Sequence, residues 1–268
     1  MELLTLDGVA LRGDGATLTL SVRAGQAVAI MGPARSGKSA LLRVCVGRDK
    51  PTRGRTTTAA DVVVAGDGLG RRARVASVAK ATGHPKANDL LVALGLWEVR
   101  NEPITDLAPG HRAAVDLLSP LLSNASLLAI DGELDRLDPW SHARAWETLG
   151  ELRSRGRAAL IVTDRPETAA HCDVVVVLRD HRVVFAGAVE ALRRLGPPHE
   201  LTVTTERQAG VRALVSPFEV SIRETPEGLQ MQAKDGQELA ARLLKEGYGD
   251  VKFVISRAPT VEEGLQGL

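Results

Sequence analysis

The stretch Gly32-Pro33-Ala34-Arg35-Ser36-Gly37-Lys38-Ser39 matches the pattern GxxxxGK[ST] in full. The apolar run Ala27–Met31 before it predicts a short buried strand, and Ser39–Gly47 after it has helical spacing. Glycines between a strand and a helix let backbone N–H groups turn toward phosphate oxygens, and the helix N-terminus adds partial positive charge. The pattern therefore predicts a phosphate-binding loop, in which Lys38 reaches the β- and γ-phosphates and the Ser39 hydroxyl ligates Mg²⁺.

The run Leu127–Asp131 supplies a second part of the same chemistry. Four apolar residues that end in a carboxylate are typical of a buried strand with one acid at its C-terminal edge. In that position Asp131 would hold Mg²⁺ beside the phosphate loop. The sequence therefore predicts ATP and Mg²⁺ as ligands, with Ser39 and Asp131 holding the metal.

Short apolar runs such as Ala159–Thr163 and Val174–Leu178 alternate with stretches of helical spacing along the first part of the chain. This alternation favours an α/β domain around a mostly parallel sheet, which together with the phosphate loop indicates the P-loop NTPase class. The other expected strands are Leu3–Leu6, Thr17–Val22, Val62–Ala65, Arg74–Val78 and Arg182–Ala186, with a turn at Gly13-Asp14-Gly15. The expected helices are Asn88–Leu96, His111–Leu122, Ser141–Arg155, Pro166–His171 and Val189–Leu195.

A domain boundary is expected at Gly196-Pro197-Pro198, which separates residues 1–196 from residues 199–268. Beyond the boundary the expected elements follow the order β-α-β-β-α-β, which is typical of a small ferredoxin-like α+β module. They are Leu201–Thr205, Ala209–Val215, Phe218–Arg223, Gly228–Ala233, Gly236–Glu246 and Val251–Ser256. The sequence thus predicts a nucleotide-binding domain followed by a separate small module.

The composition excludes several classes of function. Lys and Arg number 34 against 33 Asp and Glu, and this formal net charge of +1 argues against a surface for nucleic acid. The longest apolar runs fall far short of the ~18 residues that a membrane span needs, and the start of the chain has no basic segment of a secretory signal. Two cysteines, Cys45 and Cys172, are too few for a disulfide framework or a CxxC metal site. Any membrane role is therefore expected to come through a partner.

With these features the chain resembles the ATP-binding subunits of ABC transporters, of the exporter-like kind, over residues 1 to about 196. Leu107-Ala108-Pro109-Gly110-His111 falls where the family has its LSGGQ signature, and Leu137-Asp138-Pro139 falls where it has its D-loop. Lys50–Gly54 resembles the turn after the phosphate-loop helix, and Ala258–Glu263 resembles the closing helix of exporter-type subunits. The resemblance implies binding of Mg·ATP, an integral membrane transporter subunit as partner, and a peripheral place on the cytoplasmic face of the cell membrane.

Several positions depart from the family's pattern, and they concern the γ-phosphate or the attacking water. Gly132 stands where the family has its catalytic Glu, and Asp164 stands where it has its switch His. Ala108 and Pro109 replace the Ser and the first Gly of the signature. Glu133 lies one residue too far along, where a strand end would point its side chain to the opposite face. Glu133 is therefore not counted as a replacement for the missing base.

The middle of the domain departs from the pattern as well. No Gln occurs between Gln26 and Gln208, so the family's Q-loop Gln is absent, and Ser77 is the residue nearest its expected place. The stretch between Ser77 and Leu107 is short for the family's helical subdomain, which is the usual contact surface for the membrane subunit. A reduced helical subdomain is therefore expected.

Together these departures predict an ATP-binding subunit with weak or no hydrolysis, the regulatory or structural half of a transporter. Because both its own site and its signature are altered, pairing with a second, intact ATP-binding subunit is favoured over a homodimer. Two alternatives remain open. The first is an active ATPase that drives export, with Glu133 or a partner's residue supplying the missing base. The second is a nucleotide-independent scaffold that keeps the loop as part of its fold.

Overall fold

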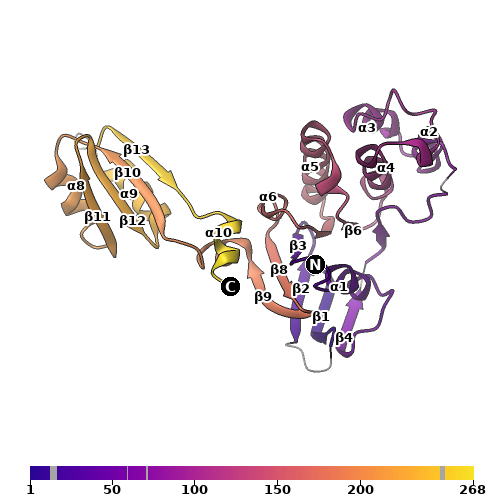
Figure 1. Cartoon of the computed structure of the whole chain (residues 1–268), viewed down its shortest axis with the longest axis horizontal. Helices are drawn as coiled ribbons and strands as arrows, with labels where there is room; N and C mark the ends of the chain where they lie inside the picture. The colour runs from indigo at the N-terminus through magenta and orange to yellow at the C-terminus, as the bar shows by residue number, and fades with distance from the viewer. Residues whose placement is uncertain (13–16, 59, 71, 248–250) are drawn as a thin grey trace. The chain divides into compact units, whose positions relative to one another are not determined.

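The computed structural model describes residues 1–12, 17–58, 60–70, 72–247 and 251–268. The expected turn at Gly13-Asp14-Gly15 lies outside these residues. The chain forms two compact units, Met1–Val189 and Glu190–Leu268 (Figure 1). Val189 begins a helix that continues into the second unit, and Gly196-Pro197-Pro198 belongs to the second unit as well.

The main sheet of the first unit has six strands in the order β5-β6-β7-β3-β8-β9. Neighbouring strands from β5 to β8 are parallel, and β9 is antiparallel to β8. The prediction of a mostly parallel α/β sheet is confirmed. The strands are β3 (Ala27–Met31), β5 (Val62–Val64), β6 (Leu127–Asp131), β7 (Ala158–Val162), β8 (Val174–Arg179) and β9 (Arg182–Ala188).

The order of these strands brings the predicted site residues to one edge of the sheet. In the β6–β7 pair Asp131 lies beside Val162, and in the β7–β3 pair Val162 lies beside Ile30. Parallel strands end at the same edge, so the segments that follow β3, β6 and β7 are neighbours there. The phosphate loop follows β3, Asp131 ends β6, and Asp164 follows β7.

A second, antiparallel sheet has the order β2-β1-β4 and packs on the same core. Its strands are β1 (Glu2–Ala10), β2 (Leu18–Arg23) and β4 (Arg53–Thr58). The sequence did not predict β4, because its residues are almost all polar and largely exposed and so show no apolar alternation. The family-like turn Lys50–Gly54 therefore runs directly into a strand.

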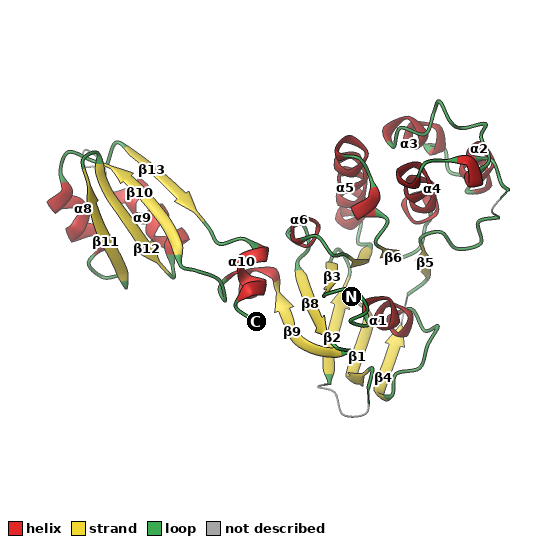
Figure 2. Ribbon diagram, viewed as in Figure 1, coloured by secondary structure: helices red, strands yellow, loops and turns green. Residues whose placement is uncertain are grey.

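The helices of the first unit, drawn in red in Figure 2, are α1 (Lys38–Cys45), α2 (Val75–Ala81), α3 (Ala87–Ala93), α4 (Pro109–Leu122), α5 (Pro139–Ser154) and α6 (Pro166–Ala169), with 3₁₀ turns at Ile104–Asp106 and Leu134–Arg136. Helix α7 (Val189–Arg193) begins at the last residue of the first unit and lies mostly in the second. None of the helices within the described ranges is long and apolar enough to cross a bilayer.

The predicted strand Arg74–Val78 is wrong, because this segment forms the start of α2. Val75, Val78 and Ala79 are buried at the i, i+3, i+4 spacing of a helix and face α4. Ser77 consequently lies inside a helix rather than at the edge of the sheet. The chain leaves the edge of the sheet earlier, at Ala65, whose N–H donates to the carbonyl of Ala129 on β6 at 2.8 Å.

The second unit contains a four-stranded antiparallel sheet in the order β11-β12-β10-β13. With the element order β-α-β-β-α-β this is the ferredoxin-like arrangement, which confirms the predicted α+β module. Apolar residues of β10 and β12, such as Leu201 and Leu229, pack under Val211 of α8 and Leu239 of α9. The elements are β10 (His199–Thr204), α8 (Gln208–Val215), β11 (Val220–Thr225), β12 (Gly228–Ala233), α9 (Gly236–Glu246), β13 (Phe253–Arg257) and α10 (Val261–Gln266).

Candidate nucleotide-binding site

The loop between β3 and α1 has a backbone that requires glycine at two positions. Gly32 has a φ of 145°, and a Cβ there would lie 2.1 Å from the carbonyl oxygen of Leu178. Gly37 has a φ of 102° and serves as the N-cap of α1 without any side-chain cap. Because L side chains rarely adopt such φ values, both glycines of the motif are explained by backbone geometry. The uncapped first turn of α1 leaves backbone N–H groups for an anion.

The side chain of Lys38 is nearly buried and its three ammonium protons have three acceptors. Nζ donates to the carbonyl oxygens of Gly32 at 2.8 Å and Pro33 at 2.9 Å. Its third partner is the carboxylate of Asp164, whose Oδ1 lies 2.8 Å away. Asp164 is thus in direct contact with the lysine of the phosphate loop.

The predicted metal ligands Ser39 and Asp131 lie together. Ser39 Oγ donates to Asp131 Oδ1 at 3.0 Å. A hydroxyl and a carboxylate oxygen in this position are ligands that Mg²⁺ prefers. Nearby, Ser36 Oγ is buried and has no hydrogen-bond partner within the described part of the chain. A buried polar atom without a partner is costly, and a phosphate oxygen would satisfy it, so the loop residues fit a bound magnesium nucleotide.

Asp135 was not foreseen as a site residue, and it organises the segment that carries Asp164. Its carboxylate accepts hydrogen bonds from Thr163 Oγ1 at 2.8 Å, from the Asp164 N–H at 2.9 Å and from Thr168 Oγ1 at 2.8 Å. Both threonines are buried. Asp135 therefore ties the turn after β6 to the segment after β7.

Glu133 is buried and bound to the backbone. Gly132 before it has a φ of 83°, and Glu133 Oε2 accepts a hydrogen bond from the Asp131 N–H at 2.6 Å. Glu133 Oε1 lies 3.7 Å from the guanidinium of Arg136. Burial raises the pKa of the Glu133 carboxyl, while backbone hydrogen bonds and Arg136 oppose the shift. Gly132 stands where the resemblance expects the catalytic base, and glycine has no carboxylate to offer.

The signature-like residues form the start of α4. Ala108 is the N-cap and offers no side-chain hydrogen bond, and Pro109 occupies the first helical position, where its missing N–H costs the helix nothing. Gly110 packs close to the turn after β6, since a Cβ there would lie 3.2 Å from the carbonyl oxygen of Arg136. Leu107 is buried, and His111 is half-buried.

The D-loop-like residues form the start of α5. Leu137 is buried, and Asp138 caps the helix by accepting hydrogen bonds from the N–H groups of Trp140 at 2.9 Å and Ser141 at 3.1 Å. Hydrogen bonding from Ser141 first, and then from the backbone, lowers the pKa of Asp138. Within the described ranges no hydrogen bond joins the starts of α4 and α5 to Lys38, so these two turns and the phosphate loop are separate features.

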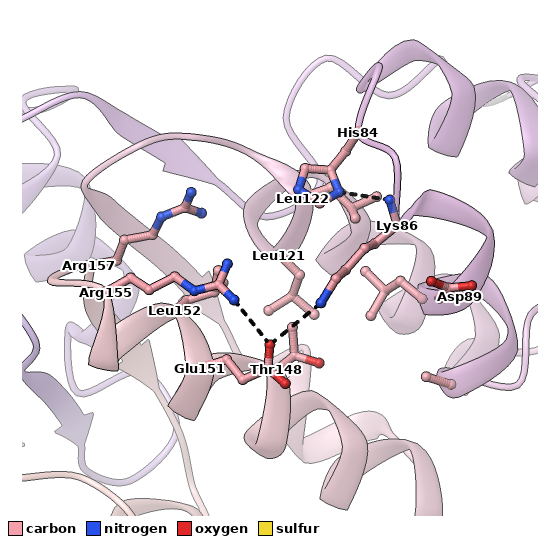
Figure 3. Close-up of a pocket in the computed structure, with 12 residues that line it drawn as sticks. His84, Lys86, Asp89, Leu121, Leu122, Thr148, Glu151, Leu152, Arg155 and Arg157 are labelled. Carbon is pink, nitrogen blue, oxygen red and sulfur yellow. Dashed lines mark hydrogen bonds and ion pairs between the residues drawn. The ribbon is translucent and has the colours of Figure 1, made fainter.

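A cavity of about 150 Å³ opens elsewhere in this unit, among α3, α4 and α5 (Figure 3). Glu151 at its rim lies 3.9 Å from Lys86 and 3.7 Å from Arg155, so the opposite charges compensate one another. The described residues that line the cavity include none from the phosphate loop, Asp131 or the signature-like turn. The cavity is therefore not part of the nucleotide site.

This geometry defines a nucleotide-binding α/β domain of the phosphate-loop class. Residues 16–133 match the family model described as ABC transporter. A protein named as an ABC transporter ATP-binding protein of Bifidobacterium longum is 25% identical over 275 residues, which cover 91% of this chain and 34% of that protein. The lipoprotein-releasing system ATP-binding protein LolD 1 of Rhodospirillum rubrum is 29% identical over 197 residues, which cover 62% of this chain and 87% of that protein.

The solved structure titled "Structure of ATP binding subunit of ABC transporter" matches with a TM-score of 0.62 at 21% identity, over 72% of this chain and 92% of that chain. At this identity the match shows the shared fold. Residues 16–133 thus match the ABC transporter family and both relatives are named as ATP-binding proteins, which confirms the resemblance to ABC transporter ATP-binding subunits drawn from the motifs. It spans about a third of the length of the Bifidobacterium longum relative.

Proposed function

We propose that this chain is an ABC transporter subunit that binds Mg·ATP and hydrolyses it weakly or not at all. Ser39 Oγ contacts Asp131 Oδ1 at 3.0 Å beside a loop whose lysine is buried, and this contact supports the binding of Mg·ATP. These two residues would hold the metal ion, and Lys38 with the first turn of α1 would bind phosphate oxygens. A bound magnesium ion would neutralise phosphate charge there.

Weak turnover of ATP is supported by the residues that follow strands β6 and β7. Gly132 has no side chain to orient water, and Glu133 is engaged with the backbone of Asp131. Asp164 carries a negative charge where the resemblance expects an imidazole that donates a hydrogen bond. Each lost positioning group or donor typically costs 10²–10³ in rate, so several losses leave turnover near background.

Pairing with other subunits is supported by the residues of the signature-like turn and by the names of the relatives. Ala108 lacks the hydroxyl and Pro109 lacks the N–H that the family's signature would offer across a dimer. A homodimer would contain two sites that are both altered in this way, whereas a second subunit with intact motifs would retain one working site. We therefore propose a heterodimer bound to an integral membrane transporter subunit, peripheral on the cytoplasmic face of the membrane. The names of both relatives likewise describe ATP-binding proteins of larger systems.

The nucleotide-binding step is tested by titrating a fluorescent ATP analogue with Mg²⁺ into the purified full chain and into Lys38→Ala. We expect saturable binding to the wild type and its loss in Lys38→Ala, because the variant removes the buried cation of the loop. Lys50→Ala changes a lysine in the turn before β4 and serves as the control. Equal affinity of wild type and Lys38→Ala would favour the nucleotide-independent scaffold instead.

A further inference from the structure

We infer that Asp164 makes this loop discriminate against nucleoside triphosphates, so that the site holds a magnesium nucleoside diphosphate more tightly than the triphosphate. The inference rests on the proposed function, because it concerns which nucleotide the same loop takes. It assigns Asp164 as a specificity-determining residue through its contact with Lys38 at 2.8 Å.

The ammonium group of Lys38 has its hydrogen-bonding capacity filled by three acceptors. An ammonium group has three N–H donors, and here all three have an acceptor, namely Gly32 O, Pro33 O and Asp164 Oδ1. To bind a terminal phosphate, Lys38 has to release one of them. The carboxylate is the charged acceptor and lies outside the loop itself, so Asp164 and the terminal phosphate compete for the same cation.

The backbone of Asp164 is held in place by Asp135. Its backbone N–H donates to Asp135 Oδ2 at 2.9 Å, and Thr163 before it donates to the same carboxylate at 2.8 Å. Thr168 adds a further bond to Asp135 at 2.8 Å. Because these hydrogen bonds to Asp135 hold the backbone of the segment, Asp164 withdraws from Lys38 by rotating its own side chain.

The negative charge of Asp164 is balanced by the positive charge of Lys38. Lys38 is the one cation within ion-pair distance of Asp164 in the part of the chain that the structure describes. When Lys38 donates to a phosphate instead, the Asp164 carboxylate loses its counter-ion and lies close to the negative charge of that phosphate. A triphosphate brings one phosphate more than a diphosphate to this end of the loop, so the penalty is larger for the triphosphate. The Asp164 side chain is 69% exposed, and solvent therefore reduces the repulsion but does not remove it.

The test is isothermal titration of the full chain with Mg·ADP and with a non-hydrolysable Mg·ATP analogue. We expect the wild type to bind the diphosphate about tenfold more tightly, a ratio that corresponds to about 1.4 kcal/mol. Asp164→Asn keeps the shape of the side chain and removes its charge, so it should raise the affinity for the triphosphate analogue about tenfold and change the diphosphate affinity by less than about twofold.

Asp49→Asn is the matched control, because it makes the same change in an exposed ion pair with Arg43 at the other end of α1. It should leave the ratio of the two affinities unchanged. Equal affinities for both nucleotides in the wild type, or an equal gain for both in Asp164→Asn, would overturn the inference while leaving the proposed function intact. Failure of the wild type to bind either nucleotide would overturn both.

Discussion

Glu133 Oε2 accepts a hydrogen bond from the backbone N–H of Asp131 at 2.6 Å, which binds the acid to the end of the strand it follows. The left-handed backbone at Gly132 permits this reversal, since its φ is 83°. The residue is buried, and burial raises the pKa of its carboxyl. Glu133 thus satisfies a backbone donor at the strand end, which is a structural task.

We expect the purified chain to release phosphate from ATP at a rate close to background, and Glu133→Gln to leave that rate unchanged. The amide oxygen of Gln can still accept the bond from Asp131, so the variant removes the charge and keeps the contact. A phosphate-release assay on wild type and variant measures both rates. Turnover near 1 s⁻¹ in the wild type that disappears in Glu133→Gln would show that Glu133 is the base after all.

We expect Asp135→Ala to lower the free energy of unfolding by about 1–3 kcal/mol. The substitution leaves the buried hydroxyl of Thr168 without its acceptor and leaves Thr163 only the carbonyl of Arg165 at 3.3 Å, and an unsatisfied buried polar group costs about that much. Urea unfolding followed by circular dichroism gives the value. Asp49→Ala, in an exposed ion pair, is the control and should change stability by no more than about 0.5 kcal/mol. Equal effects of the two variants would argue against an organising role for Asp135.

The strands that carry the candidate site follow from local sequence, and their predicted bounds match the structure. The bounds of β3 and β6 are those of the apolar runs Ala27–Met31 and Leu127–Asp131, because parallel strands are buried on both faces and so consist almost wholly of apolar residues. The contact of Ser39 with Asp131 likewise follows from the phosphate-loop pattern and the order of the strands. Such features can be predicted from a single sequence because they have a periodicity or a fixed spacing.

The parts that depend on long-range side-chain contacts were missed. Asp135 and Asp164 are 29 positions apart, and nothing in their spacing indicates that one holds the backbone of the other. The pairing of Asp164 with Lys38 depends on that same arrangement. Strand β4 was missed for a different reason, since Arg53–Thr58 is polar and is stabilised by pairing with β1 rather than by burial of alternate side chains.

We expect the chain to be recovered from its native source together with an integral membrane protein and a second ATP-binding chain. The family's pattern has other residues at Ala108, Pro109 and Gly132, which belong to the signature-like turn and to the chain's own nucleotide site, so a partner with intact motifs would be needed for a working site. Affinity purification from detergent-solubilised membranes, with subunits identified by mass, is the measurement. Recovery of this chain alone, as a stable homodimer closed by ATP, would contradict the expectation.

His142 makes the stability of the first unit sensitive to mildly acidic pH through its contact with Trp146. Trp146 Nε1 donates to His142 Nε2 at 3.1 Å, and the Trp146 ring stacks on His171 with centroids 4.8 Å apart. Indole can only donate, so His142 Nε2 has to be unprotonated in this contact. Burial first, and then the neighbouring charges of His171 and Arg165, lower the pKa of His142, while Asp135 opposes the shift.

Because the pKa of His142 is lower in the folded state than its ordinary value near 6.5, the unfolded chain binds the proton more readily. The stabilising contribution is therefore complete above about pH 6.5 and is lost as the pH falls below that value toward the folded pKa. We expect His142→Gln, which can accept the bond from Trp146 without titrating, to flatten the dependence of unfolding free energy on pH between about 7 and 5.5. His111→Gln makes the same change at the start of α4 and is the control. Identical pH profiles for wild type and His142→Gln in urea unfolding would show that His142 does not carry the acid sensitivity.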